Sequence, residues 1–421
     1  MRPLALAIVA AAVVSAAPGR SEEAVSLEGD ATGAVQRVDR ATALKLGAER
    51  GPGVATAAAA LPGGTEAKEA AHATLVLPPR LSIGAGRRFG PDAGFEVQLG
   101  AMLDIPLGPV GSARANTASA YLASVSADVK RARLDGALAA GVAWSRALEA
   151  REVLKLRATS AAHARTIHDL AKIRVKSGAG QPVEGALAAA EVGLAGAQTL
   201  DAEGLLVDAL AQLRLAIALP TGDPIEVTGE SCYADEPLVE EKVALAAARD
   251  QNPTLVLARA RAASSRTEVK LVSATLTPTL GVGVTFLRGS LGEQVWLGTV
   301  SFPLPFADPA AFERARALGL ADVAEAEVKR VEAQVEKDVH VAVHDQKHTR
   351  EVRDKLGSDA IVPAREALRL AKIQFEGGTE VVTLVLLARQ RLIAIEEQHV
   401  HACGEVVRAD LRLRRLMGRL P

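Results

Sequence analysis

The tetrapeptide Leu370-Ala371-Lys372-Ile373 has an earlier copy in this chain, Leu170-Ala171-Lys172-Ile173, and 370 − 170 = 200 places the two half a chain apart. The later copy is followed by Phe375-Glu376-Gly377-Gly378-Thr379 and the earlier one by Val175-Lys176-Ser177-Gly178. Each copy leads into a glycine turn that separates two long helical patterns. We expect each turn to be the far tip of a helical hairpin.

Other landmarks recur at nearly the same offset, which indicates that a whole unit is duplicated. The matching pairs are Pro52 and Pro253 (253 − 52 = 201), Gly84-Ala85-Gly86 and Gly281-Val282-Gly283 (281 − 84 = 197), and Ile105-Pro106-Leu107 and Phe302-Pro303-Leu304 (302 − 105 = 197). The sequence therefore predicts two repeats, 22–225 and 226–421. Each repeat has a helix, two strands and a long helical hairpin.

The composition favours long helices over a thick globular core. Apolar residues make up 49% of the 421 residues, but aromatic residues only 3%. A globular core usually contains more large side chains, whereas alanine suits helices that pack closely side by side. The net charge of −1, with no basic run between aromatic residues, excludes a general nucleic-acid binder.

The N-terminus has the pattern of a secretory signal peptide, which we assign to residues 1–21. Met1-Arg2 is followed by the apolar run Leu4 to Val14 and by the small residues Ser15-Ala16-Ala17. No later apolar run reaches the roughly 18 residues that a membrane helix needs. We therefore expect an exported protein that is periplasmic, secreted or a membrane β-barrel.

The chain has two cysteines, Cys232 in a linker and Cys403 in a helical pattern. A disulfide between them would suit an oxidising compartment. Because the two residues lie far apart in the sequence, we favour two separate buried thiols.

Two segments, 81–105 and 279–302, change from helical to alternating patterns, and each predicts a β-hairpin. The return strand of the second hairpin alternates less regularly, because Val295 and Leu297 fall on the face that should be polar. The strands have roughly the 9–11 residues with which a tilted strand crosses a bilayer. One alternative is a soluble sheet with one face on a core. Since four strands are too few to close a barrel, the other is a barrel to which several chains contribute.

Four long helical patterns form two predicted hairpins. In the first, Gly111 to Lys176 would span about 100 Å at 1.5 Å per residue, and the return runs from Pro182 to Leu219. In the second, a helix that starts at Asp308-Pro309 runs to Glu376, and the return covers Val381 to Met417. Small apolar residues at three- and four-residue spacing predict antiparallel coiled-coil packing.

The order and spacing of these features resemble a TolC-family outer membrane efflux protein over nearly the whole mature chain. The residues that carry the resemblance are Asn252-Pro253-Thr254-Leu255, Pro278 at a strand entry, Phe302-Pro303-Leu304 at a strand exit, and the tip glycines Gly178 and Gly378. The fold class it implies is mainly α with a membrane β part. Duplicated helical hairpins form a periplasmic α-barrel, and four strands per chain contribute to a trimeric 12-stranded β-barrel.

The resemblance also implies a function and partners. It predicts a homotrimeric, passive outer membrane duct in contact with outer membrane lipid and without a cofactor. A periplasmic adaptor would connect it to an inner-membrane transporter of the resistance-nodulation-division (RND) type. The tips that face the adaptor would be Gly178-Ala179 and Gly378-Thr379. Because the chain is short, it resembles the branch of the family that exports heavy-metal cations.

The expected closed end of the duct departs from the family pattern. Some members place carboxylates around the aperture, whereas Leu384 and Leu387 stand there in this chain. A leucine ring would close the duct by packing and dewetting. The alternative is that these leucines pack the hairpin. Glu184 and Glu380 lie near the tips, where two acids cannot form the acid–base latch of other members, and solvated surface acids are the alternative for both.

The sequence contains no phosphate loop, zinc-ligand spacing or nucleophile elbow, so we expect no enzyme. His340, His344 and His348 recur at four-residue spacing, which places three imidazoles on one helix face. They are candidate metal ligands, with His399 and His401 on the returning helix. The alternative is a polar coiled-coil face. Other readings of the whole chain are a soluble periplasmic coiled-coil scaffold or adaptor, and a metal-binding periplasmic protein.

Overall fold

The structure is a computed structural model, and it describes the residues of nine segments. These are 35–72, 77–89, 93–220, 222, 224–232, 237–289, 292–303, 310–379 and 381–420. The predicted signal peptide 1–21, the helix start Asp308-Pro309 and the candidate Glu380 lie outside the described residues.

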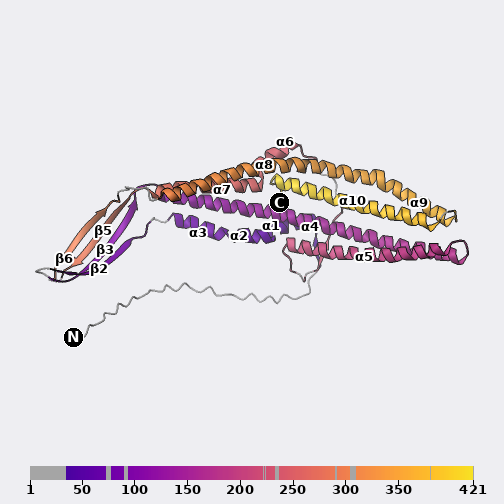
Figure 1. Ribbon diagram of the computed structural model, residues 1–421, viewed down its shortest axis with the longest axis horizontal. Coiled ribbons are helices and arrows are strands. Elements are labelled where there is room, and N and C mark those ends of the chain that lie inside the picture. The colour runs from indigo at the N-terminus through magenta and orange to yellow at the C-terminus, as the bar shows by residue number, and fades with distance from the viewer. Residues whose placement is uncertain are drawn as a thin grey trace, which may run out of the picture.

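The first long hairpin consists of α4 (Val110–Lys176) and α5 (Pro182–Ala216). At 67 residues, α4 spans about 100 Å, as the sequence predicts. It contains no proline, and Pro182 stands in the first turn of α5, where its missing N–H leaves no helical bond unmade. The two helices run side by side to a common tip (Figure 1).

The second long hairpin is less regular than the sequence predicts. It consists of α8 (Ala311–Lys355), a π-helical turn at Leu356–Ile361, α9 (Val362–Glu376) and α10 (Val382–Leu416). The helical path ends at Glu376 as predicted, but the π-helical turn that divides it was not predicted. Pro363 is the second residue of α9, and its ring nitrogen has no hydrogen to donate to a carbonyl one turn earlier.

Shorter helices pack along the two hairpins. They are α1 (Arg40–Arg50), α2 (Pro52–Ala58) and α3 (Leu61–Ala71) on α4, α6 (Glu241–Gln251) on α8, and α7 (Pro253–Thr275) between α4 and α8. Asn252 begins α7, because its side chain accepts hydrogen bonds from the N–H groups of Thr254 and Leu255. Gly51 separates α1 from α2, whereas Pro62-Gly63-Gly64 lies inside α3.

A two-stranded parallel sheet joins the two halves of the chain near the middle of the helices. Its strands, β1 (Gln36–Val38) and β4 (Ile225–Val227), were not predicted. The indole N–H of the fully buried Trp144 in α4 donates to the carbonyl of Val38 at 3.2 Å. The predicted repeat boundary between residues 225 and 226 lies within β4.

A four-stranded antiparallel sheet stands at the end of the molecule opposite the hairpin tips (Figure 1). Its order is β2 (Arg80–Arg88), β3 (Gly94–Pro106), β5 (Thr279–Arg288) and β6 (Gln294–Ser301). Among the described residues, the outer edges of β2 and β6 have no partner strand. None of the described helices combines the length and the apolar character that a membrane-crossing helix needs.

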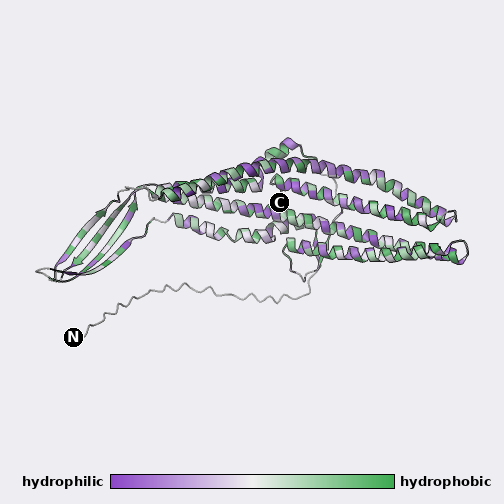
Figure 2. Ribbon diagram, viewed as in Figure 1, coloured by the Kyte–Doolittle hydropathy of each residue, from purple (hydrophilic) through white to green (hydrophobic). Residues whose placement is uncertain are grey.

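The two faces of this sheet differ in polarity, and Figure 2 shows the alternation along the strands. The face that we call the apolar sheet face carries exposed large side chains from all four strands. They are Leu81, Ile83, Leu99, Ile105, Val282, Val284, Trp296 and Val300. The opposite, polar sheet face holds the ion pair of Arg80 with Asp104 at 2.7 Å. As predicted, Leu297 lies on the polar sheet face, opposite Thr285.

Cys232 and Cys403 form a disulfide, with their Cα atoms 5.0 Å apart. The prediction of two separate thiols is therefore wrong. The reason is the path of the chain after β4, which returns to α10. The guanidinium of Arg151 in α4 fixes this path by donating to the carbonyls of Val227 and Gly229.

Candidate functional site at the helical tips

The two hairpin tips have the same backbone geometry, 200 residues apart. At the first, the N–H of Ala179 donates to the carbonyl of Arg174 at 2.9 Å; at the second, the N–H of Thr379 donates to that of Gln374 at 3.0 Å. Gly178 and Gly378 have φ angles of +76° and +78°, which glycine adopts without strain. Each tip is thus a Schellman turn, and the structure brings all four predicted tip residues to one end of the molecule.

One side chain connects the two tips. The guanidinium of Arg174 lies over the ring of Phe375, 4.6 Å from its centroid, and donates to the backbone carbonyl of Phe375. The same guanidinium donates to the carbonyl of Ala179 at 3.4 Å. A cation over an aromatic face is attracted by about 0.5–2 kcal/mol. The two turns therefore form one surface.

The two candidate aperture leucines project away from the hairpin interior. Leu384 is 38% and Leu387 is 63% exposed, while their neighbours Val382, Val385 and Leu386 are buried against α9 and α4. Within one chain, Leu387 is mostly exposed, whereas Leu384 is partly covered by the hairpin.

Glu184 lies in the first turn of α5, close to the tip, and it is only 5% exposed. Its Oε2 atom has no hydrogen-bond partner among the described residues. The alternative of a solvated surface acid is therefore wrong for Glu184. Burying a carboxylate is costly unless it is paired, and its position beside the N-terminus of α5 offsets part of that cost.

A buried arginine links the two hairpins behind the tips. Arg389 of α10 is 3% exposed; it donates to Glu191 Oε1 of α5 at 3.0 Å and to the carbonyl of Ser160 in α4 at 2.9 Å. Gln390 donates to the other oxygen of Glu191 at 2.9 Å. Burial lowers the pKa of Arg389, and the Glu191 carboxylate opposes this shift. This group could not be predicted from the sequence, because its charged residues have the spacing of solvated ones.

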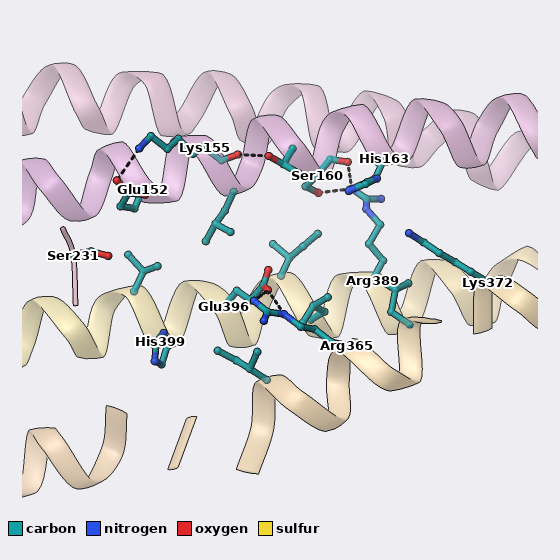
Figure 3. A pocket seen from close by; sticks show the side chains of 17 residues that line it. Glu152, Lys155, Ser160, His163, Ser231, Arg365, Lys372, Arg389, Glu396 and His399 are labelled. Carbon is teal, nitrogen blue, oxygen red and sulfur yellow. Dashed lines mark hydrogen bonds and ion pairs between the residues drawn. The ribbon is translucent and has the colours of Figure 1, made fainter. Parts of the chain in front are cut away.

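A cavity of about 470 Å³ opens between α4, α9 and α10, next to Arg389 (Figure 3). Its two carboxylates are already paired, Glu152 with Lys155 at 2.9 Å and Glu396 with Arg365 at 2.8 Å. Burial and the charges of Lys372 and Arg389 lower the pKa of His163 in its wall. Figure 3 shows Ser231 and His399 toward one end of this cavity and Lys372 toward the other.

Solved structures of outer membrane proteins share this fold. The Campylobacter jejuni CmeC outer membrane channel superposes with a TM-score of 0.76 at 14% identity, over 90% of this chain and 85% of that chain. VceC from Vibrio cholerae gives 0.73 at 17% identity, over 89% and 95%. The open state of the Neisseria gonorrhoeae MtrE outer membrane channel gives 0.71 at 17% identity, over 90% and 88%. At these identities the likeness concerns the fold.

The second half of the sequence matches a known family. No curated protein matches the sequence, but the family model of the outer membrane efflux protein matches residues 244–419, which include α7, the sheet strands β5 and β6, and the whole second hairpin. Over this part of the chain, the sequence matches the outer membrane efflux protein family. The protein is an outer membrane efflux channel whose helices form a tunnel in the periplasm.

The family match and the shared fold together decide between the predicted functions. Outer membrane efflux proteins are transport channels and not enzymes, and they work as trimers with a periplasmic adaptor and an inner-membrane transporter. The alternatives of a soluble periplasmic scaffold and of a metal-binding periplasmic protein are therefore set aside.

The predicted histidine cluster lies on the exposed side of α8. His344 and His348 stack with their ring centroids 5.6 Å apart, and His340 Nδ1 lies 3.0 Å from Glu241 Oε1 of α6. In the part of the chain that the structure describes, the one group of three possible metal ligands is a different one: Cys232, His399 and Cys403. A metal site on α8 therefore stays a prediction.

Proposed function

We propose that three copies of this efflux channel join their sheets edge to edge into one barrel of 4 × 3 = 12 strands. The observation that carries the proposal is a sheet with two unpaired edges and an exposed apolar face. Unpaired edges invite a strand of another chain, and an apolar face of this width needs a cover such as lipid. The polar sheet face would then line the lumen.

The glycines of the sheet support this orientation. Gly84, Gly86, Gly100, Gly281 and Gly283 all lie on the polar sheet face. A Cβ atom at Gly281 would lie 3.0 Å from a carboxylate oxygen of Asp104, which is closer than side chains normally approach. Small residues on one face allow a sheet to curve toward that face. The polar sheet face is therefore suited to the inside of a barrel.

The tips are proposed to contact a periplasmic adaptor, which connects the channel to an inner-membrane transporter of the RND type. Two Schellman turns of matching geometry, joined by Arg174, offer an adaptor the same backbone shape twice per chain. In a trimer this gives 2 × 3 = 6 equivalent positions. The same adaptor surface could therefore bind the tip of either repeat.

A photo-reactive side chain at Ala179 or Thr379 is expected to cross-link the channel to its adaptor in intact cells, detected as a covalent adduct on denaturing gels. The same group at Ser126 of α4 is the control, because 176 − 126 = 50 residues of helix place it about 75 Å from the tip. Adducts at Ser126 but not at the tips would contradict the proposal.

Leu384 and Leu387 are proposed to close the duct as a ring of three chains. Their exposure in a single chain leaves them available to one another in the trimer. Full burial stabilises a closed ring by about 1.5–3 kcal/mol for each leucine. The buried Glu184 is proposed to support the aperture from behind. Glu380 precedes Leu384 by four residues in the sequence and is proposed to belong to the same region.

The double variant Leu384→Ser/Leu387→Ser is expected to conduct ions more readily than the parent channel, because the closed ring loses its apolar contacts. Single-channel conductance in planar bilayers measures this. Leu205→Ser is the control, since this leucine of α5 is equally exposed but far from the tip. An unchanged open probability in the double variant would show that the leucines do not form the gate.

The cargo is proposed to include heavy-metal cations. The support is the stacked pair His344 and His348, which offers imidazole nitrogens on an exposed helix face.

A further inference from the structure

We propose that Cys232, Cys403 and His399 form a redox-gated site for a thiophilic divalent cation of the zinc class. In the oxidised protein the two cysteines form the disulfide, and no ion binds. In the reduced protein the same two sulfur atoms and the imidazole bind one ion per chain. The site lies away from the tips and from the sheet.

The geometry of three ligand atoms carries this proposal. One sulfur from each cysteine and one imidazole nitrogen of His399 all lie within 4.8 Å of one another. Nδ1 of His399 lies 3.9 Å from Sγ of Cys403. Zinc holds sulfur at about 2.3 Å and nitrogen at about 2.0–2.1 Å, so two ligands on one ion stand about 3.5–4 Å apart in a tetrahedral site. Nδ1 of His399 already lies at such a distance from Sγ of Cys403. The two sulfur atoms, which are bonded to each other in the disulfide, must separate to about 3.5–4 Å after reduction, and the exposed Cys232 side chain can make this movement.

The fold holds two of the ligands in place before any ion binds. His399 and Cys403 are one helical turn apart on α10, so both side chains lie on one face. Cys232 is held near them by the linker path after β4, where Arg151 of α4 fixes two backbone carbonyls. Cys403 is buried, and Cys232 is exposed. An ion could therefore enter from the side of Cys232.

The π-helical turn of the second hairpin provides space for the imidazole. Gly357, the second residue of this turn, faces His399: a Cβ atom there would lie 3.4 Å from Nε2. Larger side chains at this position would displace the ring from Cys403. Single π-helical turns recur at functional sites in other proteins. His399 and Ser231 also line the 470 Å³ cavity, which leaves room for water as a fourth ligand.

The choice of cation follows from the ligands. Two thiolates and one imidazole are soft and borderline donors, which favour zinc, cadmium and copper(I) over magnesium or calcium. The three histidines of α8 offer no sulfur and do not form a group of three within ligand distance. The two candidate sites therefore differ in the metal that they prefer and in their dependence on reduction.

A dithiol can supply the electrons and protons that reduction of the Cys232–Cys403 disulfide requires. The dithiol gives two electrons and two protons to the disulfide, so the S–S bond breaks, two cysteine thiols form, and the dithiol closes to its own disulfide. Binding of the divalent ion then displaces the two thiol protons, because the thiolate is the ligand. Both the disulfide and the bound ion connect the linker to α10. The reduced protein without an ion has neither connection.

Cobalt(II) titration of the full-length channel in mild detergent tests the proposal. The protein is first reduced with a water-soluble phosphine, which is oxidised to the phosphine oxide, and excess reagent is removed. We expect one cobalt per chain, with a thiolate-to-cobalt charge-transfer band and the visible bands of a tetrahedral ion. Zinc should displace the cobalt. The unreduced channel should show neither band.

Single substitutions distinguish metal binding at this site from metal binding by the other histidines. Cys232→Ser and Cys403→Ser should each abolish the charge-transfer band at one equivalent of cobalt. His399→Gln should weaken binding by at least about tenfold, because even the loss of a residue that only hydrogen-bonds to a metal ligand costs that much. The matched control is His401→Gln, two residues along α10, whose imidazole instead contacts Glu149 at 2.8 Å. It should bind like the parent. Because Cys232 is exposed, its variant tests the site even if the Cys403 variant folds poorly.

Three results would overturn the proposal. The first is a disulfide that the phosphine does not reduce in the folded trimer. The second is a reduced channel that shows no charge-transfer band at one equivalent of cobalt. The third is equal affinity in the parent channel and in His399→Gln.

Discussion

Replacing Arg389 with methionine is expected to lower the free energy of unfolding by about 3–5 kcal/mol per chain, because it leaves the carboxylate of Glu191 buried without its cation. Glu191 is 9% exposed and would keep only the hydrogen bond from Gln390. The carbonyl of Ser160 would also lose the donor that Arg389 supplies at 2.9 Å. Methionine matches the length of the arginine stem, so the loss comes from the charge and its hydrogen bonds. Denaturant unfolding of the purified channel, followed by circular dichroism, measures the change.

Two further variants distinguish a buried ion pair from a general loss of charge. Arg369 of α9 pairs with Glu366 on an exposed surface, and Arg369→Met should cost at most about 1 kcal/mol. The double variant Arg389→Met/Glu191→Leu should recover much of the lost stability, since an apolar pair of similar volume replaces the ion pair. If Arg389→Met and Arg369→Met unfold at the same denaturant concentration, the proposed role of Arg389 is wrong.

Features that depend on local pattern could be predicted from the sequence. The tip turns follow from the repeated tetrapeptide and from Gly178 and Gly378, which adopt the positive φ that ends each helix. The two faces of the sheet follow from the alternation of apolar and polar residues along the strands. The exception at Leu297, which lies on the polar sheet face, was also predicted. Both signals lie within a few residues of the feature that they predict, so no knowledge of distant contacts is needed.

Features that depend on distant contacts could not be predicted. β1 and β4 are three residues each, which is too short for a period, and each exists because the other lies beside it. The disulfide depends on the same pairing, since it directs the linker back to α10. In the candidate site, Arg389 and Glu184 have the spacing of solvated charges, and only the packing of α4, α5 and α10 buries them. The i, i+4 spacing of His399 and Cys403 can be read from the sequence. The third ligand of the candidate metal site, Cys232, is 171 residues from Cys403, so its proximity could not be predicted.

An arginine in place of Val284 is expected to destabilise the membrane-inserted channel by about 2–4 kcal/mol per chain, because it would place a charge at the middle of a lipid-facing surface. Val284 lies on the apolar sheet face, in the middle of β5, opposite Ala101 of β3 and Gly298 of β6. The matched control is Thr285→Arg, one residue along the same strand. Since successive residues point to opposite faces, this arginine would project from the polar sheet face into the lumen, where water solvates it.

The amount of trimer in the outer membrane measures the difference between the two variants. Membranes are washed with carbonate and extracted in mild detergent, and the mass of the extracted species is determined. Val284→Arg should reduce the yield of washed, membrane-bound trimer severely, while Thr285→Arg should leave it close to the parent value. Because the two substitutions add the same side chain to the same strand, equal yields would mean that lipid does not cover the apolar sheet face. A monomer released from the parent membranes by washing would sink the pooled barrel itself, since the unpaired edges of β2 and β6 would then have no partner to explain them.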